Sequence, residues 1–141
     1  MARTILIVED DRALAGTLEI GLLAIDNVDT VTVFDGREAM EYLETHSPAP
    51  AVVLTDLDLP RVDGYQLIKW MRSRPELLRV PVVAMSARHD GTEALQAGAN
   101  EFLAKPFALA AVPRLAMSLA GTPTVALRSE ERRVGKECRS R

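Results

Sequence analysis

Four short apolar runs in this chain each end at a charged or hydroxyl residue, and longer stretches of helical periodicity separate them. The runs cover residues 5–8, 51–55, 82–85 and 101–104, and the residues that follow them are Glu9, Asp56, Ser86 and Lys105. Short β-branched runs that alternate with helical patterns are typical of a parallel sheet with crossover helices. The carboxyl ends of neighbouring parallel strands share one crevice, so we expect these four side chains to meet at one site.

The length and pattern of the chain predict one domain built from five β/α units. With 141 residues, 48% of them hydrophobic, the chain is long enough for one core and too short for two ordinary domains. Expected strands cover about 4–8, 30–34, 51–55, 82–85 and 101–104, and expected helices cover about 12–23, 39–43, 65–71, 92–97 and 108–119. Asp11 suits the N-cap of the first helix. Pro113 falls inside the last helix and should kink it, at a cost of about 3 kcal/mol, unless that helix begins late.

The apolar runs are too short for insertion into a membrane. None approaches the roughly 18 residues of a membrane span, and Glu9 interrupts the first run, so it does not read as a signal peptide. We therefore expect a cytoplasmic protein without a membrane partner.

The net charge of −3 combines an acidic body with a basic tail. Residues 128–141 carry six Lys or Arg and three Glu, whereas the remaining 127 residues carry 11 basic and 17 acidic side chains. An acidic body repels the phosphates of nucleic acids, so we expect no direct nucleic-acid binding by this domain.

The tail itself resembles the conceptual translation of a common short-read sequencing adapter over all 14 residues from Arg128 to Arg141. We interpret residues 1–120 as the domain, 121–127 as a linker or truncated end, and 128–141 as a non-native tail. The single cysteine, Cys138, lies in that tail and carries no information about redox environment. Such a tail is compatible with the loss of a C-terminal output domain of the natural protein.

A carboxylate cluster at one strand edge has an electrostatic cost. Two unit charges 4 Å apart repel by about 4 kcal/mol at an effective dielectric constant near 20. Glu9, Asp10 and Asp56 together need a neutralising partner, and a hard cation with oxygen ligands, Mg²⁺ in particular, suits such a site.

The joint pattern of motifs resembles the receiver domain of two-component response regulators over residues 3 to 120. The motifs are Glu9-Asp10-Asp11, Thr55-Asp56-x-Asp58-x-Pro60-x-x-Asp63-Gly64, Ser86-Ala87 and Lys105-Pro106-Phe107. The resemblance implies a doubly wound five-stranded parallel sheet of order 2-1-3-4-5 with helices on both faces. It also implies a switch that a histidine kinase or a phosphotransfer protein phosphorylates. Such a switch dephosphorylates itself and is not a turnover enzyme.

The resemblance assigns roles to individual residues. Asp56 would be the phosphoacceptor, Asp10 a direct Mg²⁺ ligand, Glu9 a ligand through water, and Asp58 a ligand through its backbone carbonyl. The remaining assignments are Ser86 and Lys105, which would contact phosphoryl oxygens, and Phe102, which would form the switch pair with Ser86. The peptide bond between Lys105 and Pro106 would be cis.

Some positions depart from the family pattern. The stretch from Ser86 to Lys105 is short, which predicts a truncated fourth helix and leaves the usual dimerisation face in doubt. Arg88 and Asp58 flank the path of an attacking water, so we expect them to tune dephosphorylation.

Two alternative functions stay open from the sequence. A haloacid-dehalogenase-like phosphatase would use Asp56 as nucleophile and Asp58 as general acid, but that motif belongs on the first strand, and here about 50 residues precede it. A pseudo-receiver would bind partners without phosphorylation.

Overall fold

The computed structural model describes residues 3–88 and 91–120, which form a five-stranded parallel sheet of order β2-β1-β3-β4-β5. The strands are β1 (Arg3–Val8), β2 (Val28–Val33), β3 (Val52–Asp56), β4 (Val82–Ser86) and β5 (Glu101–Ala104). This confirms the predicted fold class and strand order. The expected linker at 121–127 and tail at 128–141 lie outside the described residues.

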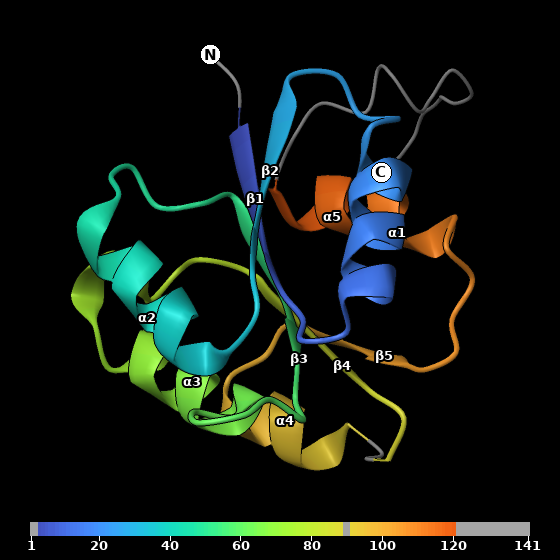
Figure 1. Cartoon of the computed structure of the whole chain (residues 1–141). Helices are drawn as coiled ribbons and strands as arrows, with labels where there is room; N and C mark the ends of the chain where they lie inside the picture. Colours follow the sequence, from blue (N-terminus) through green and yellow to red (C-terminus); the bar gives the residue numbers. More distant parts are fainter. Residues whose placement is uncertain (1–2, 89–90, 121–141) are drawn as a thin grey trace, which may run out of the picture.

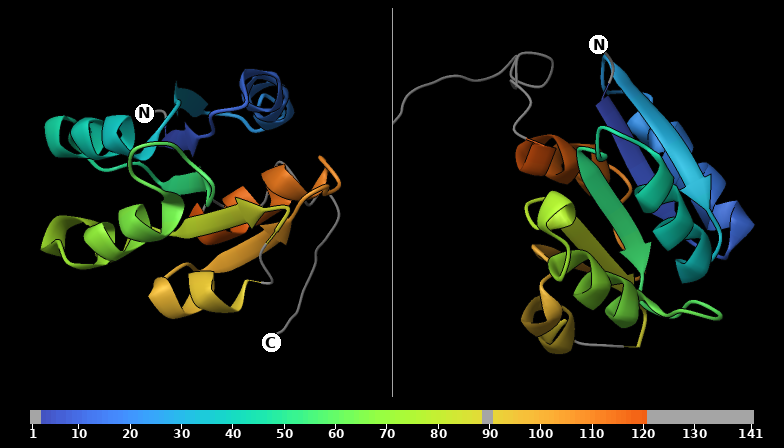
Figure 2. Two further views of the ribbon diagram at one scale, coloured as in Figure 1. Left: turned by 60° about the horizontal axis from the view of Figure 1, so that its bottom comes forward. Right: turned by 90° about the vertical axis from the view of Figure 1, so that its left-hand side faces the viewer.

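Helices cover both faces of this sheet (Figure 1). One face carries α1 (Arg12–Leu22) and α5 (Ala111–Ala120), and the other carries α2 (Gly36–Thr45), α3 (Gly64–Arg72) and the short α4 (Thr92–Ala97). A single 3₁₀ turn, η1 (Pro75–Leu77), follows α3. Figure 2 shows the two helical layers from the side. In the described ranges, no helix has both the length and the apolar character needed to cross a membrane.

The alternation of side chains along the strands builds two separate cores. Ile5 and Ile7 of β1 pack into the core under α1 and α5, whereas Leu6 and Val8 pack into the core under α2, α3 and α4. Every residue of β3 and β4 is buried, because helices cover both of their faces. Burial of both faces explains why these strands read as continuous apolar runs.

Aspartate side chains cap three of the helices. Asp11, Asp35 and Asp63 accept hydrogen bonds from backbone N–H groups in the first turns of α1, α2 and α3. Asp63 also forms a capping box with Gln66. The prediction for Asp11 is confirmed. The cap role separates these three carboxylates from the acidic residues at the strand ends.

The last helix begins later than predicted. It starts at Ala111 and not near residue 108, so Pro113 is its third residue. The first N–H groups of a helix have no intrahelical acceptor, and proline is tolerated there. The expected kink at Pro113 is therefore absent. The second strand also differs from the prediction, because it begins at Val28, two residues early.

Because Pro113 occupies the first turn of α5, replacing it should change stability little. We expect Pro113→Ala to alter the free energy of unfolding by no more than about 0.5 kcal/mol. Urea denaturation followed by circular dichroism measures this difference. A gain near 3 kcal/mol would instead show that the proline strains a longer helix.

Candidate functional site

The carboxyl ends of four strands bring the predicted side chains to one edge of the sheet. Glu9 follows β1, Asp56 and Ser86 are the last residues of β3 and β4, and Lys105 follows β5. Backbone hydrogen bonds continue the ladder past the strands, since the Lys105 N–H donates to the Ser86 carbonyl at 2.9 Å. The sheet register therefore fixes the backbone positions from which these side chains extend.

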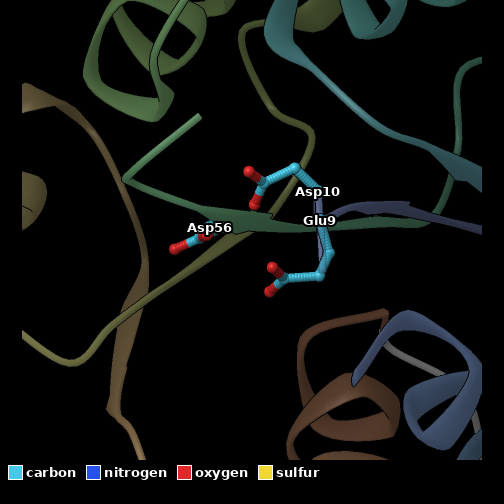
Figure 3. Close-up of side chains that lie close together, drawn as sticks. All are labelled: Glu9, Asp10 and Asp56. Atoms are coloured by element: carbon cyan, nitrogen blue, oxygen red, sulfur yellow. The ribbon is translucent and has the colours of Figure 1, made fainter. Parts of the chain in front are cut away.

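Three carboxylates gather at this edge (Figure 3). Glu9, Asp10 and Asp56 each contribute an oxygen, and these atoms lie within 4.8 Å of one another. Glu9 and Asp56 are buried, at 0% and 4% exposure, whereas Asp10 is exposed. The ammonium group of Lys105 lies 3.0 Å from Glu9 Oε1 and 3.5 Å from Asp56 Oδ1. One positive charge thus faces three negative charges.

The buried members of the cluster have shifted pKa values. Burial raises the pKa of Glu9 above its ordinary value, and the nearby Asp56 charge adds to this. Burial likewise raises the pKa of Asp56, and it outweighs the attraction of Lys105. Burial also opposes the charge on Lys105, but the hydrogen bond to Glu9 and the charge of Asp56 prevail, so the pKa of Lys105 is raised. Each carboxylate is less stable in its ionised form here than in water.

The donors of this cluster fit a hard divalent cation. All three are carboxylates, the ligand type that Mg²⁺ prefers. Backbone N–H groups orient two of them: Asp11 donates to Glu9 Oε2 at 3.1 Å, and Asp58 donates to Asp56 Oδ1 at 3.3 Å. A bound cation would neutralise charge that Lys105 alone leaves uncompensated.

We expect Asp56→Asn to stabilise the metal-free protein at neutral pH. A carboxyl whose pKa is raised by folding binds its proton more tightly in the folded state, so its contribution to stability is lost as pH rises through that folded pKa. In buffer with a chelator, the variant should exceed the wild type by roughly 1 kcal/mol near pH 7.5. The difference should shrink toward pH 4, which urea denaturation at both pH values would reveal. Equal stability of the variant and the wild type at both pH values would contradict the proposed effect of the clustered charges.

A second group of side chains joins Asp58, Ser86 and Arg88. Asp58 Oδ2 accepts a hydrogen bond from Ser86 Oγ at 3.1 Å, and Asp58 Oδ1 accepts one from Arg88 Nη2 at 2.7 Å. The backbone N–H of Arg88 in turn donates to Ser86 Oγ at 3.0 Å. The three residues thus form a closed ring of hydrogen bonds, in which the Asp58 carboxylate is directed toward β4. Sequence reasoning placed Asp58 and Arg88 beside the site but did not predict that they pair.

Tight backbone contacts hold the loop between β3 and α3 against the end of β3. A Cβ atom added to Gly64 would lie 2.4 Å from the Asp56 carbonyl oxygen, and one added to Gly36 would lie 2.1 Å from the Val62 carbonyl oxygen. The Gly64 N–H also donates to the Leu57 carbonyl at 3.1 Å. Glycine at both positions lets α2 and α3 approach the loop closely.

An ion pair that sequence reasoning missed fastens the same loop to α2. Arg61 Nη2 and Nε donate to Asp35 Oδ2 at 2.6 and 3.1 Å. Although burial opposes its charge, hydrogen bonds from the Glu38 backbone and from Arg61 lower the pKa of Asp35. The two residues lie 26 positions apart, so no local pattern could have shown the pair.

Gly64→Ala should destabilise the protein. The added methyl group would meet backbone atoms of Asp56 and Leu57, which cannot move without displacing the end of β3 and the Asp56 side chain. We expect a loss of about 2 kcal/mol or more in the free energy of unfolding. Gly16→Ala is the matched control, because a Cβ at Gly16 of α1 meets nothing within 4 Å, and it should be stabilising by up to about 1 kcal/mol. Equal effects of the two substitutions would contradict this contact.

The predicted switch aromatic lies on β5 near the start of α4. Phe102 is partly buried and packs against the core under α2, α3 and α4. A Cβ added to Gly91, whose φ is +90°, would lie 2.7 Å from Phe102 Cγ. Gly91 therefore leaves the space that this ring occupies. The peptide bond between Lys105 and Pro106 is cis, as expected.

Comparison with known proteins decides the family. Residues 5–116 match the family model of the response regulator receiver domain. This chain belongs to that family. It is a phosphorylation-switched receiver of two-component signalling, and receivers of this family are regulatory switches.

Relatives in sequence and structure agree with this assignment. The chain is 42% identical over 112 residues to the transcriptional regulatory protein QseB of Haemophilus influenzae, which covers 77% of this chain and 48% of QseB. It is 31% identical over 117 residues to the polar-differentiation response regulator DivK of Brucella ovis, covering 81% of this chain and 90% of DivK. The receiver thus spans about half of QseB and nearly all of DivK.

A solved structure with a metal ion has the same fold. The receiver domain of the sensor histidine kinase PA1611 from Pseudomonas aeruginosa PAO1 has a TM-score of 0.76 and 30% identity, and the match covers 86% of this chain and 100% of that one. That structure contains a magnesium ion coordinated in its active-site cleft. The acidic cluster of this chain has the composition that such an ion requires.

Proposed function

We propose that Asp56 accepts a phosphoryl group from a phosphohistidine, with Mg²⁺ bound by the acidic cluster. The observation that carries the proposal is the buried Asp56 carboxylate, which lies 3.5 Å from Lys105 Nζ and has an oxygen within 4.8 Å of oxygens of Glu9 and Asp10. Positioning and charge neutralisation supply most of the catalysis of phosphoryl transfer, and these residues provide both. The fold of the chain and its family membership support the same assignment.

In this proposal the acidic residues hold the cation and the acceptor together. Asp10 and Asp56 would hold the ion directly, Glu9 through water, and Asp58 through its backbone carbonyl. Mg²⁺ would draw charge from the phosphoryl oxygens and offset the repulsion between carboxylates. The Asp58 carboxylate points to Ser86 and Arg88, which agrees with a role for its main chain in binding the ion.

The transfer is a displacement at phosphorus. A carboxylate oxygen of Asp56 forms a bond to phosphorus while the bond from phosphorus to the histidine nitrogen breaks, and that nitrogen keeps the electron pair. Lys105 and Ser86 then contact two phosphoryl oxygens, Lys105 as a charge and Ser86 as a hydroxyl donor. Later attack by water on phosphorus releases phosphate and restores the carboxylate.

The partner of this proposal is a histidine kinase or a phosphotransfer protein. QseB is about twice as long as the matched region and DivK barely longer, so the receiver module occurs in relatives of both sizes. We propose that any output of this protein is driven by the phosphorylated receiver, with Ser86 and Phe102 as the residues whose positions change.

The two alternative functions receive less support. A phosphatase of the haloacid-dehalogenase type would need its aspartate pair on the first strand, whereas Asp56 ends the third strand and Asp58 follows it. A general acid at Asp58 would also have to leave Ser86 and Arg88. A pseudo-receiver has no need of the complete set of Glu9, Asp10, Asp56 and Lys105, which this structure holds in contact.

The test is the intact mass of the protein after incubation with acetyl phosphate. We expect a gain of one phosphoryl group that requires Mg²⁺ and disappears on addition of a chelator. Asp56→Asn removes the acceptor oxygen and should abolish the gain. Labelling of Asp56→Asn to the same extent as wild type would show that another residue is the acceptor.

Asp58→Asn provides the control for the phosphatase alternative. It keeps the backbone carbonyl, so a receiver should still accept the phosphoryl group. Hydrolysis of a phosphomonoester by the wild type that is lost in Asp58→Asn would favour the phosphatase.

A further inference from the structure

The ring of Asp58, Ser86 and Arg88 fixes the Ser86 hydroxyl from two directions. Its hydrogen is directed to Asp58 Oδ2 at 3.1 Å, and its oxygen accepts the Arg88 N–H at 3.0 Å. Ser86 is fully buried, so bulk water does not compete for these bonds. These two hydrogen bonds restrain the hydroxyl.

A hydroxyl has a single hydrogen to donate. The bond to Asp58 uses an ionised acceptor, and such hydrogen bonds are shorter and stronger than neutral ones. Ser86 can donate to a phosphoryl oxygen on Asp56 only after it releases the Asp58 carboxylate. The two acceptors are thus alternatives for one hydrogen.

Arg88 orients the Asp58 carboxylate, which would compete with a phosphoryl oxygen for the Ser86 hydrogen. Its guanidinium lies 2.7 Å from Asp58 Oδ1, which leaves Oδ2 for Ser86. The Arg88 side chain is 74% exposed, against 30% for Asp58, and exposed ion pairs add little to overall stability. The pair's main effect is to place Oδ2 against the hydroxyl.

We propose that the Asp58 carboxylate is a positioning group that opposes the switched state by holding the Ser86 hydroxyl. This inference rests on the proposed function, because it takes Asp56 as the phosphoacceptor and Ser86 as a donor to its phosphoryl group. It adds a direction to the effect of Asp58: loss of the carboxylate favours the phosphorylated conformation. Asp58 acts through Ser86 and does not touch the transferred group.

Simple charge repulsion is the competing explanation. Asp58 is an anion near Asp56, and removing any anion there would favour a phosphoryl group. The two explanations differ in their dependence on Ser86. Repulsion acts whether or not residue 86 has a hydroxyl, whereas the positioning effect disappears without it.

The experiment is a double-mutant cycle with beryllofluoride, a stable analogue of a phosphoryl group on a carboxylate. Isothermal titration in Mg²⁺ buffer gives the Kd for wild type, Asp58→Ala, Ser86→Ala and the double variant of the full chain. We expect Asp58→Ala to bind beryllofluoride about fivefold to tenfold more tightly than wild type. In the Ser86→Ala background, the same substitution should change Kd by less than about twofold.

Asp58→Asn separates shape from charge. Its amide oxygen still accepts the Ser86 hydrogen, but without a full charge, so we expect a smaller gain than for Asp58→Ala. It also preserves the side-chain shape should Asp58→Ala fold poorly, which circular dichroism would show. A gain of the same size for Asn and Ala would support repulsion and overturn the inference.

The outcomes separate this inference from the proposed function. An equal gain from Asp58→Ala in both backgrounds, or no gain at all, would overturn the role of Asp58 and leave Asp56 as acceptor. Failure of wild type to bind beryllofluoride would overturn the proposed function and this inference with it.

Discussion

The clustering of negative charge at one sheet edge is the constraint around which this domain is organised. A parallel sheet with strands buried on both faces directs its polar strand ends to a single crevice. Here that places Glu9 and Asp56 together in a buried setting with Lys105 as their basic partner. The site is therefore built to prefer added positive charge, and its binding chemistry follows from its position in the fold.

The parts of the domain that could be predicted from sequence are those with a periodic or strand-end signal. The five strands and the convergence of Asp56, Ser86 and Lys105 follow from apolar runs that end in polar residues, and the Asp11 cap follows from its place before a helical pattern. Family resemblance added the cis bond before Pro106, whereas the switch role that it gives to Phe102 stays a prediction. These features are encoded by residues close in sequence or by the topology of the sheet.

The features that escaped prediction depend on contacts between distant residues. The Arg61 to Asp35 pair joins a loop to a helix 26 positions away, and the ring through Asp58 and Arg88 crosses 30 positions. The late start of α5 escaped for a different reason, because the residues before Ala111 have the composition of a helix although they form turns. In each case contacts between residues far apart in the sequence decide the structure, and the local sequence does not.

The close approach of Gly64 to the Asp56 carbonyl has a practical consequence. With no side chain between them, the end of β3 and the start of α3 are in close backbone contact. Trp70, the one tryptophan of the sequence, lies on α3 with the Arg74 guanidinium 5.0 Å from its ring. The chain thus carries an intrinsic fluorophore on the helix that adjoins the carboxylate cluster, and emission from that ring is expected to report a displacement of α3 without any attached label.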